Sequence, residues 1–302
     1  GPNGLGAIYA LNPNGGTPTL FADLAALGAN VGTVLSNSAR GLGAPGTPNN
    51  DASTFDQVGK VGLGDIDISD DESKLYVVSL NDQKLYILNL PAGTLAGSYS
   101  IPNPGCTGGN WRPFATKFKD NVLYVGGVCD AATSQQASNL SATVYKFDGA
   151  TFTNVLSFPL NYTKGAAGGS TCVNANSNWR PWIATFPPCT YFFNYPEPIL
   201  SDIEIDVDGS MILGFSDRFT HQIGNANYPP TGTSFIYPAS GGDILRACYV
   251  NGSFAAPGSA NCPNKSANSQ GPGGGEYYYQ EVAADSAQEA AQGGLALLPG
   301  SG

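Results

Sequence analysis

The residues with the clearest chemical potential in this sequence are acidic side chains in two similar stretches. In "SDIEIDVDG", residues 201–209, acidic and apolar residues alternate, and the acidic ones are Asp202, Glu204, Asp206 and Asp208. Successive side chains of a strand point to opposite faces of its sheet, so these carboxylates are expected to share one face. Asp65 and Asp67 in "GDIDIS" repeat part of the pattern.

Carboxylates placed so closely repel each other unless water or a cation separates them. Ca²⁺ binds about six to eight oxygen ligands, and strands from two sheets can supply several of them. We therefore predict a calcium site formed by Asp65, Asp67, Asp202, Glu204 and Asp206. The alternative is that these are solvated strand residues and ordinary turn residues.

A second candidate site is a motif that occurs twice, as "NWRPF" at 110–114 and "NWRPW" at 178–182. Each copy lies between two cysteines. In one interpretation, tryptophan and proline pack beneath a loop at equivalent places in two repeats, and arginine binds a carboxylate or carbonyls. In the other, a sugar or peptide binds a platform formed by Trp111, Arg112, Trp179 and Arg180.

Nucleophilic catalysis has little support in the sequence. His221 is the single histidine, so a Ser-His-Asp arrangement can occur once at most, and no Gly-x-Ser-x-Gly element surrounds a serine. We interpret His221, in "RFTHQI", as a strand residue. Paired carboxylates for a glycoside hydrolase or lyase stay an alternative because acidic residues are plentiful. No catalytic residue is identified.

The composition excludes several classes of partner. The 302 residues carry a net charge of -10, with 13 Lys and Arg. So few cations argue against binding to nucleic acid or to an anionic membrane surface. No apolar run reaches the length of a membrane span. The opening Gly1-Pro2 resembles a protease scar, so one domain is expected over residues 3–302.

The six cysteines predict an oxidising compartment. They have no Cys-x-x-Cys spacing, and one histidine gives no companion for a zinc site. Their grouping along the chain suggests local disulfides, Cys106 with Cys129, Cys172 with Cys189 and Cys248 with Cys262. Disulfides persist outside the cytoplasm, so we expect an extracellular or cell-surface protein. Asn-x-Ser/Thr triplets at Asn139, Asn161, Asn251 and Asn264 are compatible with that location.

Short strands with a period of two recur along the chain and predict an all-β fold. Examples are "KLYVVSL", "KLYILNL" and "SMILGF". Turns are expected at 70–72, at Asn81-Asp82 and at Asp208-Gly209. The stretches 62–88 and 199–223 read as the same unit of strand, acidic turn and strand. Repeats of this kind predict a disulfide-stabilised β-propeller of about six or seven irregular blades; two packed β-sandwiches are the alternative.

Four stretches, "VGLGDIDISDDESKLYVVSLNDQKLYILNLP", "NWRPFATKFKDNVLYVGGVC", "LSDIEIDVDGSMILGFSDR" and "GGLALLPGSG", together resemble a bacterial family. They are similar to the propeller-like head of large secreted or cell-surface proteins that carry serine-aspartate-repeat B-like modules further along. The resemblance implies an adhesive or structural module without assigned catalytic residues. It also implies that another strand pair follows "LPGSG", so that this chain is cut short at its C-terminus.

These observations predict a non-catalytic extracellular module for surface adhesion or assembly. Its partner would be a surface polymer, a protein or a second copy, and its cofactor Ca²⁺. The alternatives are a glycoside hydrolase or lyase with paired carboxylates in a central funnel, and a self-associating subunit of a surface filament.

Overall fold

The computed structural model describes residues 3–167, 170–172, 178–279 and 291–298. The fold is all-β, with 37% of residues in strands and 6% in helices. None of the helices in the described residues has the length and apolarity needed to cross a membrane.

The described residues form three four-stranded antiparallel sheets. The first contains β3 (Leu63–Ile68), β4 (Lys74–Ser79), β5 (Lys84–Asn89) and β6 (Thr94–Ser100). The second contains β7 (Trp111–Lys119), β8 (Val122–Cys129), β9 (Ser141–Phe147) and β10 (Phe152–Pro159). The third contains β13 (Pro198–Ile205), β14 (Met211–Asp217), β16 (Asp243–Val250) and β17 (Ser253–Ala255). In the first two sheets, each strand pairs with the next one along the chain.

Smaller elements fill the connections. β1 (Ala7–Ala10) pairs with β2 (Thr19–Asp23), and β12 (Tyr191–Asn194) pairs in parallel with β11 (Ser170–Thr171) and β15 (Ile236–Pro238). The short helices are α1 (Ala52–Phe55) and α2 (Arg218–Ile223), and single 3₁₀ turns lie at Ala137–Asn139 and Pro272–Gly274.

Strand β4 carries a continuous apolar run because both faces of its sheet are buried. On β4, Leu75 and Val77 pack against residues of β1 and β2, including Ile8. Val78, on the opposite face, packs against residues of the second sheet, including Leu123. Apolar residues on both faces of a strand therefore hold neighbouring sheets together through successive cores.

The predicted tight turns are confirmed. Residues 69–73 join β3 to β4, residues 80–83 join β4 to β5, and residues 206–210 join β13 to β14. Gly209 has a φ of +83°, a conformation that glycine adopts without the steric cost of a side chain.

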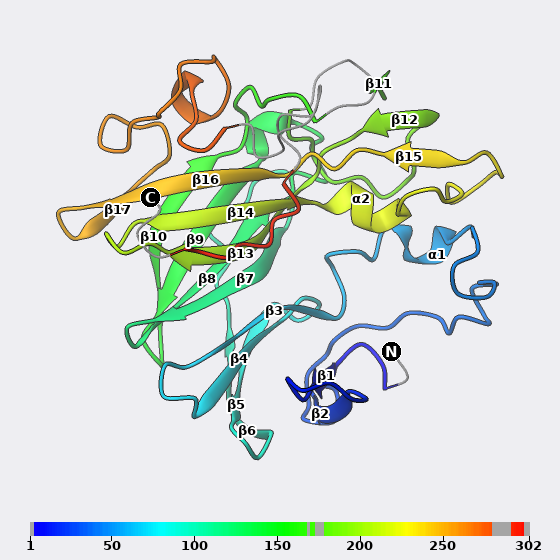
Figure 1. Cartoon of the computed structure of the whole chain (residues 1–302), viewed down its shortest axis with the longest axis horizontal. Coiled ribbons are helices and arrows are strands. Elements are labelled where there is room, and N and C mark those ends of the chain that lie inside the picture. Colours follow the sequence, from blue (N-terminus) through cyan, green and yellow to red (C-terminus); the bar gives the residue numbers. More distant parts are fainter. Residues whose placement is uncertain (1–2, 168–169, 173–177, 280–290, 299–302) are drawn as a thin grey trace.

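The three sheets fan out from the region where their first strands, β3, β7 and β13, lie against one another (Figure 1). Within the part of the chain that the structure describes, no sheet closes on itself. The described residues thus contain three four-stranded units where the sequence predicts six or seven blades. The predicted number of blades comes from dividing the chain length by the length of one blade. Long connections without strands, such as residues 24–62, reduce the number of strands that the chain can form.

The three predicted disulfides are all present, Cys106–Cys129, Cys172–Cys189 and Cys248–Cys262. They close loops with sequence separations of 23, 17 and 14 residues. Three disulfides are consistent with an extracellular or other oxidising location.

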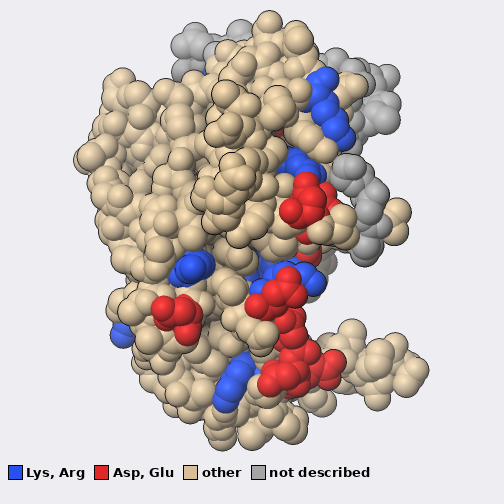
Figure 2. Space-filling model, turned by 90° about the vertical axis from the view of Figure 1, so that its left-hand side faces the viewer, with Lys and Arg blue, Asp and Glu red and all other residues tan. Residues whose placement is uncertain are grey.

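Most of the surface on the left-hand side of the molecule is uncharged (Figure 2). Many of the charged side chains visible there lie along one side of the view, where acidic and basic residues alternate, and a few basic residues stand apart. This face therefore lacks the extended positive patch that a polyanion requires.

Candidate functional site

The region where the first strands meet contains the acidic residues selected from the sequence. Each of these strands carries a β-bulge near its start, between Leu63 and Ile66 in β3, Pro113 and Ala115 in β7, and Leu200 and Asp202 in β13. A bulge inserts one extra residue and bends the strand. The same irregularity at the same place makes β3, β7 and β13 structurally equivalent.

The acidic side chains of β3 accept hydrogen bonds from the backbone of β7. Asp65 Oδ2 lies 2.9 Å from the amide nitrogen of Thr116 and 3.2 Å from its hydroxyl. Asp67 Oδ2 accepts the N–H of Phe118 at 2.6 Å. Both pairs are 51 residues apart in the sequence. A carboxylate that accepts a backbone N–H forms a charge-assisted hydrogen bond, so these side chains join the first sheet to the second.

Asp202, in the first strand of the third sheet, forms the corresponding hydrogen bond with a segment near residue 295. Its Oδ2 lies 2.7 Å from the amide nitrogen of Leu295, and the hydroxyl of its neighbour Ser201 donates to the carbonyl of Gly293 at 3.0 Å. In the first sheet, a Cβ added to Gly64, which precedes Asp65, would lie 2.8 Å from the carbonyl oxygen of Phe114.

Phe114 and Gly293 each precede the N–H donor by two residues. Residues 293–295 are therefore placed against β13 as residues 114–116 are placed against β3. The second strands of the sheets show the same relation. A Cβ on Gly126 of β8 would approach Leu200 and Ile203 of β13, the first strand of the next sheet. A Cβ on Gly214 of β14 would likewise approach Gly293 and Leu295.

The other two predicted calcium ligands have basic partners. Glu204 Oε1 lies 2.7 Å from Lys117 Nζ, which links β13 to β7. Asp206 lies just after β13 rather than within it, and its Oδ2 accepts from Arg246 Nη1 at 2.8 Å. Among the described residues, no group of three His, Cys, Asp or Glu side chains is placed to hold a metal ion. The calcium site stays a prediction, and in this structure the five carboxylates bind protein donors.

Asp65 and Asp202 also line a cavity of about 360 Å³. Burial raises the pKa of Asp65 to about 6, and the negative charge of Asp202 adds to this effect, while the hydrogen bond from Thr116 opposes it. Burial raises the pKa of Asp202 as well. A carboxyl group with a pKa of about 6, as for Asp65, keeps its proton to a higher pH than an ordinary aspartate, which is a property required of a general acid.

The same cavity contains the single histidine. His221 Nε2 lies 2.7 Å from the hydroxyl oxygen of the buried Ser216. Burial lowers the pKa of His221, so its neutral form is favoured. The prediction that His221 is a strand residue is wrong, because it lies in α2. The helix begins there because the Asp217 carboxylate caps it by accepting the N–H of Phe219 at 2.9 Å.

The two Asn-Trp-Arg-Pro copies do not occupy equivalent places. Residues 111–114 lie in β7, whereas residues 178–182 lie outside the strands, between β11 and β12. A short motif does not fix its own secondary structure; the hydrogen bonds of its surroundings do. Trp111 is 1% exposed and Trp179 is 2% exposed, so neither indole presents a face to a ligand.

The two copies meet at Asp130. Arg112 Nε lies 2.7 Å from Asp130 Oδ2, and the N–H of Trp182 donates to the carbonyl of Asp130 at 3.0 Å. The guanidinium carbon of Arg112 lies 5.4 Å from the centroid of the Trp182 ring. Arg180 stacks on Tyr195 at 5.0 Å. These contacts correspond to the packing interpretation of the motif.

A buried ion pair was missed by the sequence analysis. Arg218 and Glu197 have no exposed side-chain area and bind each other, and the Arg218 guanidinium also stacks on Trp182 at 4.4 Å. Ile183 donates its N–H to Glu197 Oε1 at 2.9 Å. Glu197 directly precedes β13 and Arg218 is the first residue of α2, and no periodic signal in the sequence marks either one as buried.

No family model matches the chain. The resemblance to the heads of bacterial surface proteins therefore stays a prediction. Related proteins are colossins of Dictyostelium discoideum. Colossin-A is 28% identical over 288 residues, which are 91% of this chain and 2% of that protein. Colossin-B is 26% identical over 284 residues, covering 84% and 7%, and Colossin-C is 29% identical over 170 residues, covering 53% and 16%.

The solved structures that resemble this fold do so weakly. A glycoside hydrolase matches with a TM-score of 0.33 and 10% identity, over 72% of this chain and 38% of that one. The WD40 domain of SCAP from fission yeast matches with a TM-score of 0.20 and 14% identity, over 61% and 31%. The chain spans only a small part of the length of these colossins, so the similarity concerns one region of much longer proteins.

Proposed function

We propose that this chain is a non-catalytic module of an extracellular protein and acts in surface adhesion or assembly. The observation that carries the proposal is the use of the first-strand carboxylates. Asp65 and Asp67 accept backbone N–H groups of β7, and Asp202 accepts the N–H of Leu295 in the segment packed against β13. Such side chains position sheets. A module whose acidic residues hold its sheets in register suits a load-bearing scaffold better than a reaction centre.

We further infer that the sheets are blades of a β-propeller-type arrangement. Three meander-like sheets with adjacent, similarly bulged first strands support this inference. The position of residues 293–295 supports it too, since they lie where the first strand of a fourth blade would begin. In propellers the innermost strands line a central axis, and here that axis would pass between β3, β7 and β13.

The extracellular location is supported by the three disulfides. A role as one module of a larger protein is supported by the colossins, of which the matching region is only 2% to 16% in the three cases above. The largely uncharged face in Figure 2 would suit neutral surface polymers or proteins as partners rather than nucleic acid.

A second candidate is a glycoside hydrolase or lyase. It is favoured by the cavity that Asp65 and Asp202 share with His221, and by the raised pKa values of both carboxyl groups. This arrangement would place paired carboxylates in the central funnel.

One experiment separates the candidates. The secreted protein, displayed in many copies on beads, is applied to immobilised neutral polysaccharides and cell-surface proteins, and release of reducing ends is assayed in parallel. Adhesion is expected to give bead retention without release. Release that Asp65→Asn and Asp202→Asn abolish, with Asp120→Asn as an exposed control, would establish the enzyme.

Assembly through self-association is tested by sedimentation of the same preparation. An increase in mass with concentration is the result expected of a filament subunit. A monomer at every concentration, combined with no bead retention, would contradict both adhesion and assembly.

A further inference from the structure

The four Asn-x-Ser/Thr triplets differ sharply in their surroundings. N-linked sugar is bulky and is carried at the surface, on an asparagine whose amide reaches solvent. Asn161, after β10, and Asn251, in the turn between β16 and β17, are exposed. No hydrogen bond joins either side-chain amide to another described residue. The hydroxyl-bearing members of these triplets, Thr163 and Ser253, are also exposed.

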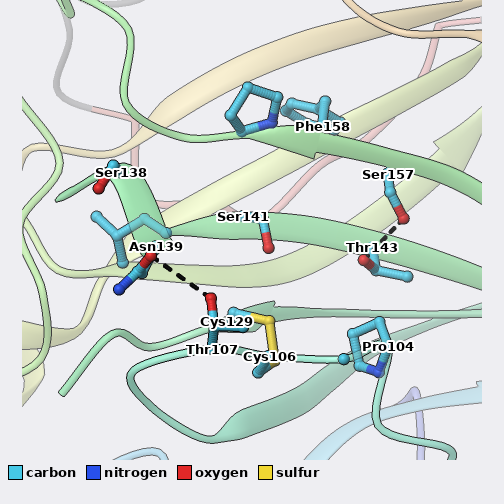
Figure 3. A pocket seen from close by; sticks show the side chains of 13 residues that line it. Pro104, Cys106, Thr107, Cys129, Ser138, Asn139, Ser141, Thr143, Ser157 and Phe158 are labelled. Carbon is cyan, nitrogen blue, oxygen red and sulfur yellow. Dashed lines mark hydrogen bonds between the residues drawn. A yellow bond between two sulfur atoms is a disulfide. The ribbon is translucent and has the colours of Figure 1, made fainter. Parts of the chain in front are cut away.

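Asn139 is half-buried, and its amide group is engaged by neighbouring residues. Its Nδ2 donates to the hydroxyl of Ser134 at 2.9 Å, and its Oδ1 lies 3.5 Å from the Thr107 hydroxyl (Figure 3). A Cβ added to Gly108 would lie 2.5 Å from that Nδ2, so the backbone of Gly108 packs directly against the amide. Asn139 lines the cavity beside the Cys106–Cys129 disulfide, but its nitrogen is turned to protein atoms.

Asn264 is held in a similar way. Its Nδ2 donates to the carbonyl of Pro272 at 2.9 Å. A Cβ on Gly275 would lie 3.1 Å from the Cβ of Asn264, and the hydroxyl of Ser266 in the same triplet accepts the N–H of Glu276 at 2.9 Å. A sugar at this nitrogen would displace the loop at 272–275.

We propose that Asn161 and Asn251 are N-glycosylation sites and that Asn139 and Asn264 carry no sugar in the folded protein. The bond formed joins asparagine Nδ2 to C1 of the first sugar. The bond broken joins that C1 to the pyrophosphate of a lipid-linked oligosaccharide donor, which leaves as the lipid pyrophosphate while the amide loses one proton. The proposal concerns modification and is independent of whether the module adheres, assembles or catalyses.

The positions have a structural consequence. The turn at Asn251 lies at the outer end of the third sheet, far from the first strand β13 (Figure 1). Asn161 follows β10, the last strand of the second sheet. Glycans at both sites would cover the outer strands and leave open the cavity lined by Asp65 and Asp202.

The test is peptide mass spectrometry of the protein secreted by a eukaryotic cell line that also glycosylates a co-expressed reporter. Amidase release of the glycans converts each modified asparagine to aspartate. The expected result is aspartate at positions 161 and 251 and asparagine at 139 and 264. Modification at 139 or 264 would overturn the proposal, as would unmodified asparagine at 161 or 251 while the reporter is glycosylated.

Variants give an independent readout. Thr163→Ala and Ser253→Ala, which leave both asparagines in place, should each remove one glycan and increase gel mobility by one step. Asn139→Gln and Asn264→Gln should leave the glycan mass unchanged. A mobility step with either of the last two would contradict the assignment, and the unaltered protein provides the mass-spectrometric result even if a variant fails to fold.

Discussion

Asp65 accepts both the backbone N–H and the hydroxyl of Thr116, 51 residues further along the chain, at 2.9 and 3.2 Å. This pair joins the first strands of two successive sheets, and Asp202 and Leu295 form its counterpart after the third sheet. The carboxylates that give the sequence its most conspicuous pattern thus connect one sheet to the next.

Removing the Asp202 carboxylate should loosen residues 293–295. Asp202→Ala deletes the acceptor of the Leu295 N–H, and the loss of a hydrogen bond to a charged group costs about 1.5–3 kcal/mol. Hydrogen exchange at Leu295 should accelerate and the free energy of unfolding should fall. Asp202→Asn keeps an acceptor oxygen and should lose less. Unchanged exchange at Leu295 in Asp202→Ala would contradict the connection.

The stability of the protein should depend on pH through Asp65. Its pKa rises from 3.8 to about 6 on folding, so the folded state binds the proton more tightly than the unfolded state. This contribution is complete below about pH 4 and is lost as pH rises through about 6, in total about 3 kcal/mol.

The comparison that isolates this effect is denaturant unfolding of the wild type and Asp65→Asn between pH 4 and pH 8. The unfolding free energy of the wild type, relative to that of Asp65→Asn, should fall as the pH rises from 4 to 8. Parallel profiles would show that Asp65 has the same pKa in both states.

Arg112 should be required for stability rather than for ligand binding. Arg112→Ala leaves the fully buried Asp130 without its ionic partner, and breaking a buried pair costs about 3–5 kcal/mol. Thermal unfolding should occur at a clearly lower temperature. Arg112→Lys keeps the positive charge but lacks the planar guanidinium group, so its unfolding temperature should lie between those of the wild type and Arg112→Ala. Wild-type stability in Arg112→Ala would refute the packing interpretation.

Each disulfide should stabilise the fold by restricting the unfolded chain. For the Cys106–Cys129 loop, with a separation of 23 residues, the chain-entropy relation gives about 3 kcal/mol. Replacing both cysteines by alanine should lower the denaturant midpoint accordingly. With reductant present, the wild type should lose at least as much stability as the variant. A variant as stable as the oxidised wild type would contradict this contribution.

Local patterns in the sequence predicted the features that depend on neighbouring residues. The acidic hairpins, the period of two and the three short-range disulfides belong to this class. The relation between Asp65 and Asp202 was also visible, because both precede an isoleucine in strands that begin equivalent sheets.

Contacts between distant segments were not accessible in this way. Nothing near Asp65 in the sequence identifies Thr116 as its donor, so a row of carboxylates was interpreted as a cation site. The two Trp-Arg-Pro copies were assigned to equivalent positions because their letters match, yet one lies in a strand and the other does not. The partner of Arg218, Glu197, lies 21 residues away across a strand pair.

The most direct test of the role of the first-strand carboxylates is thermal unfolding of the disulfide-intact protein with and without excess calcium chelator, for the wild type, Asp65→Ala and Asp202→Ala. If the carboxylates connect sheets through backbone hydrogen bonds, both variants should unfold at lower temperature and the chelator should change none of the three curves. A chelator-induced fall in the wild type that is reduced in both variants would show instead that a cation holds these strands together.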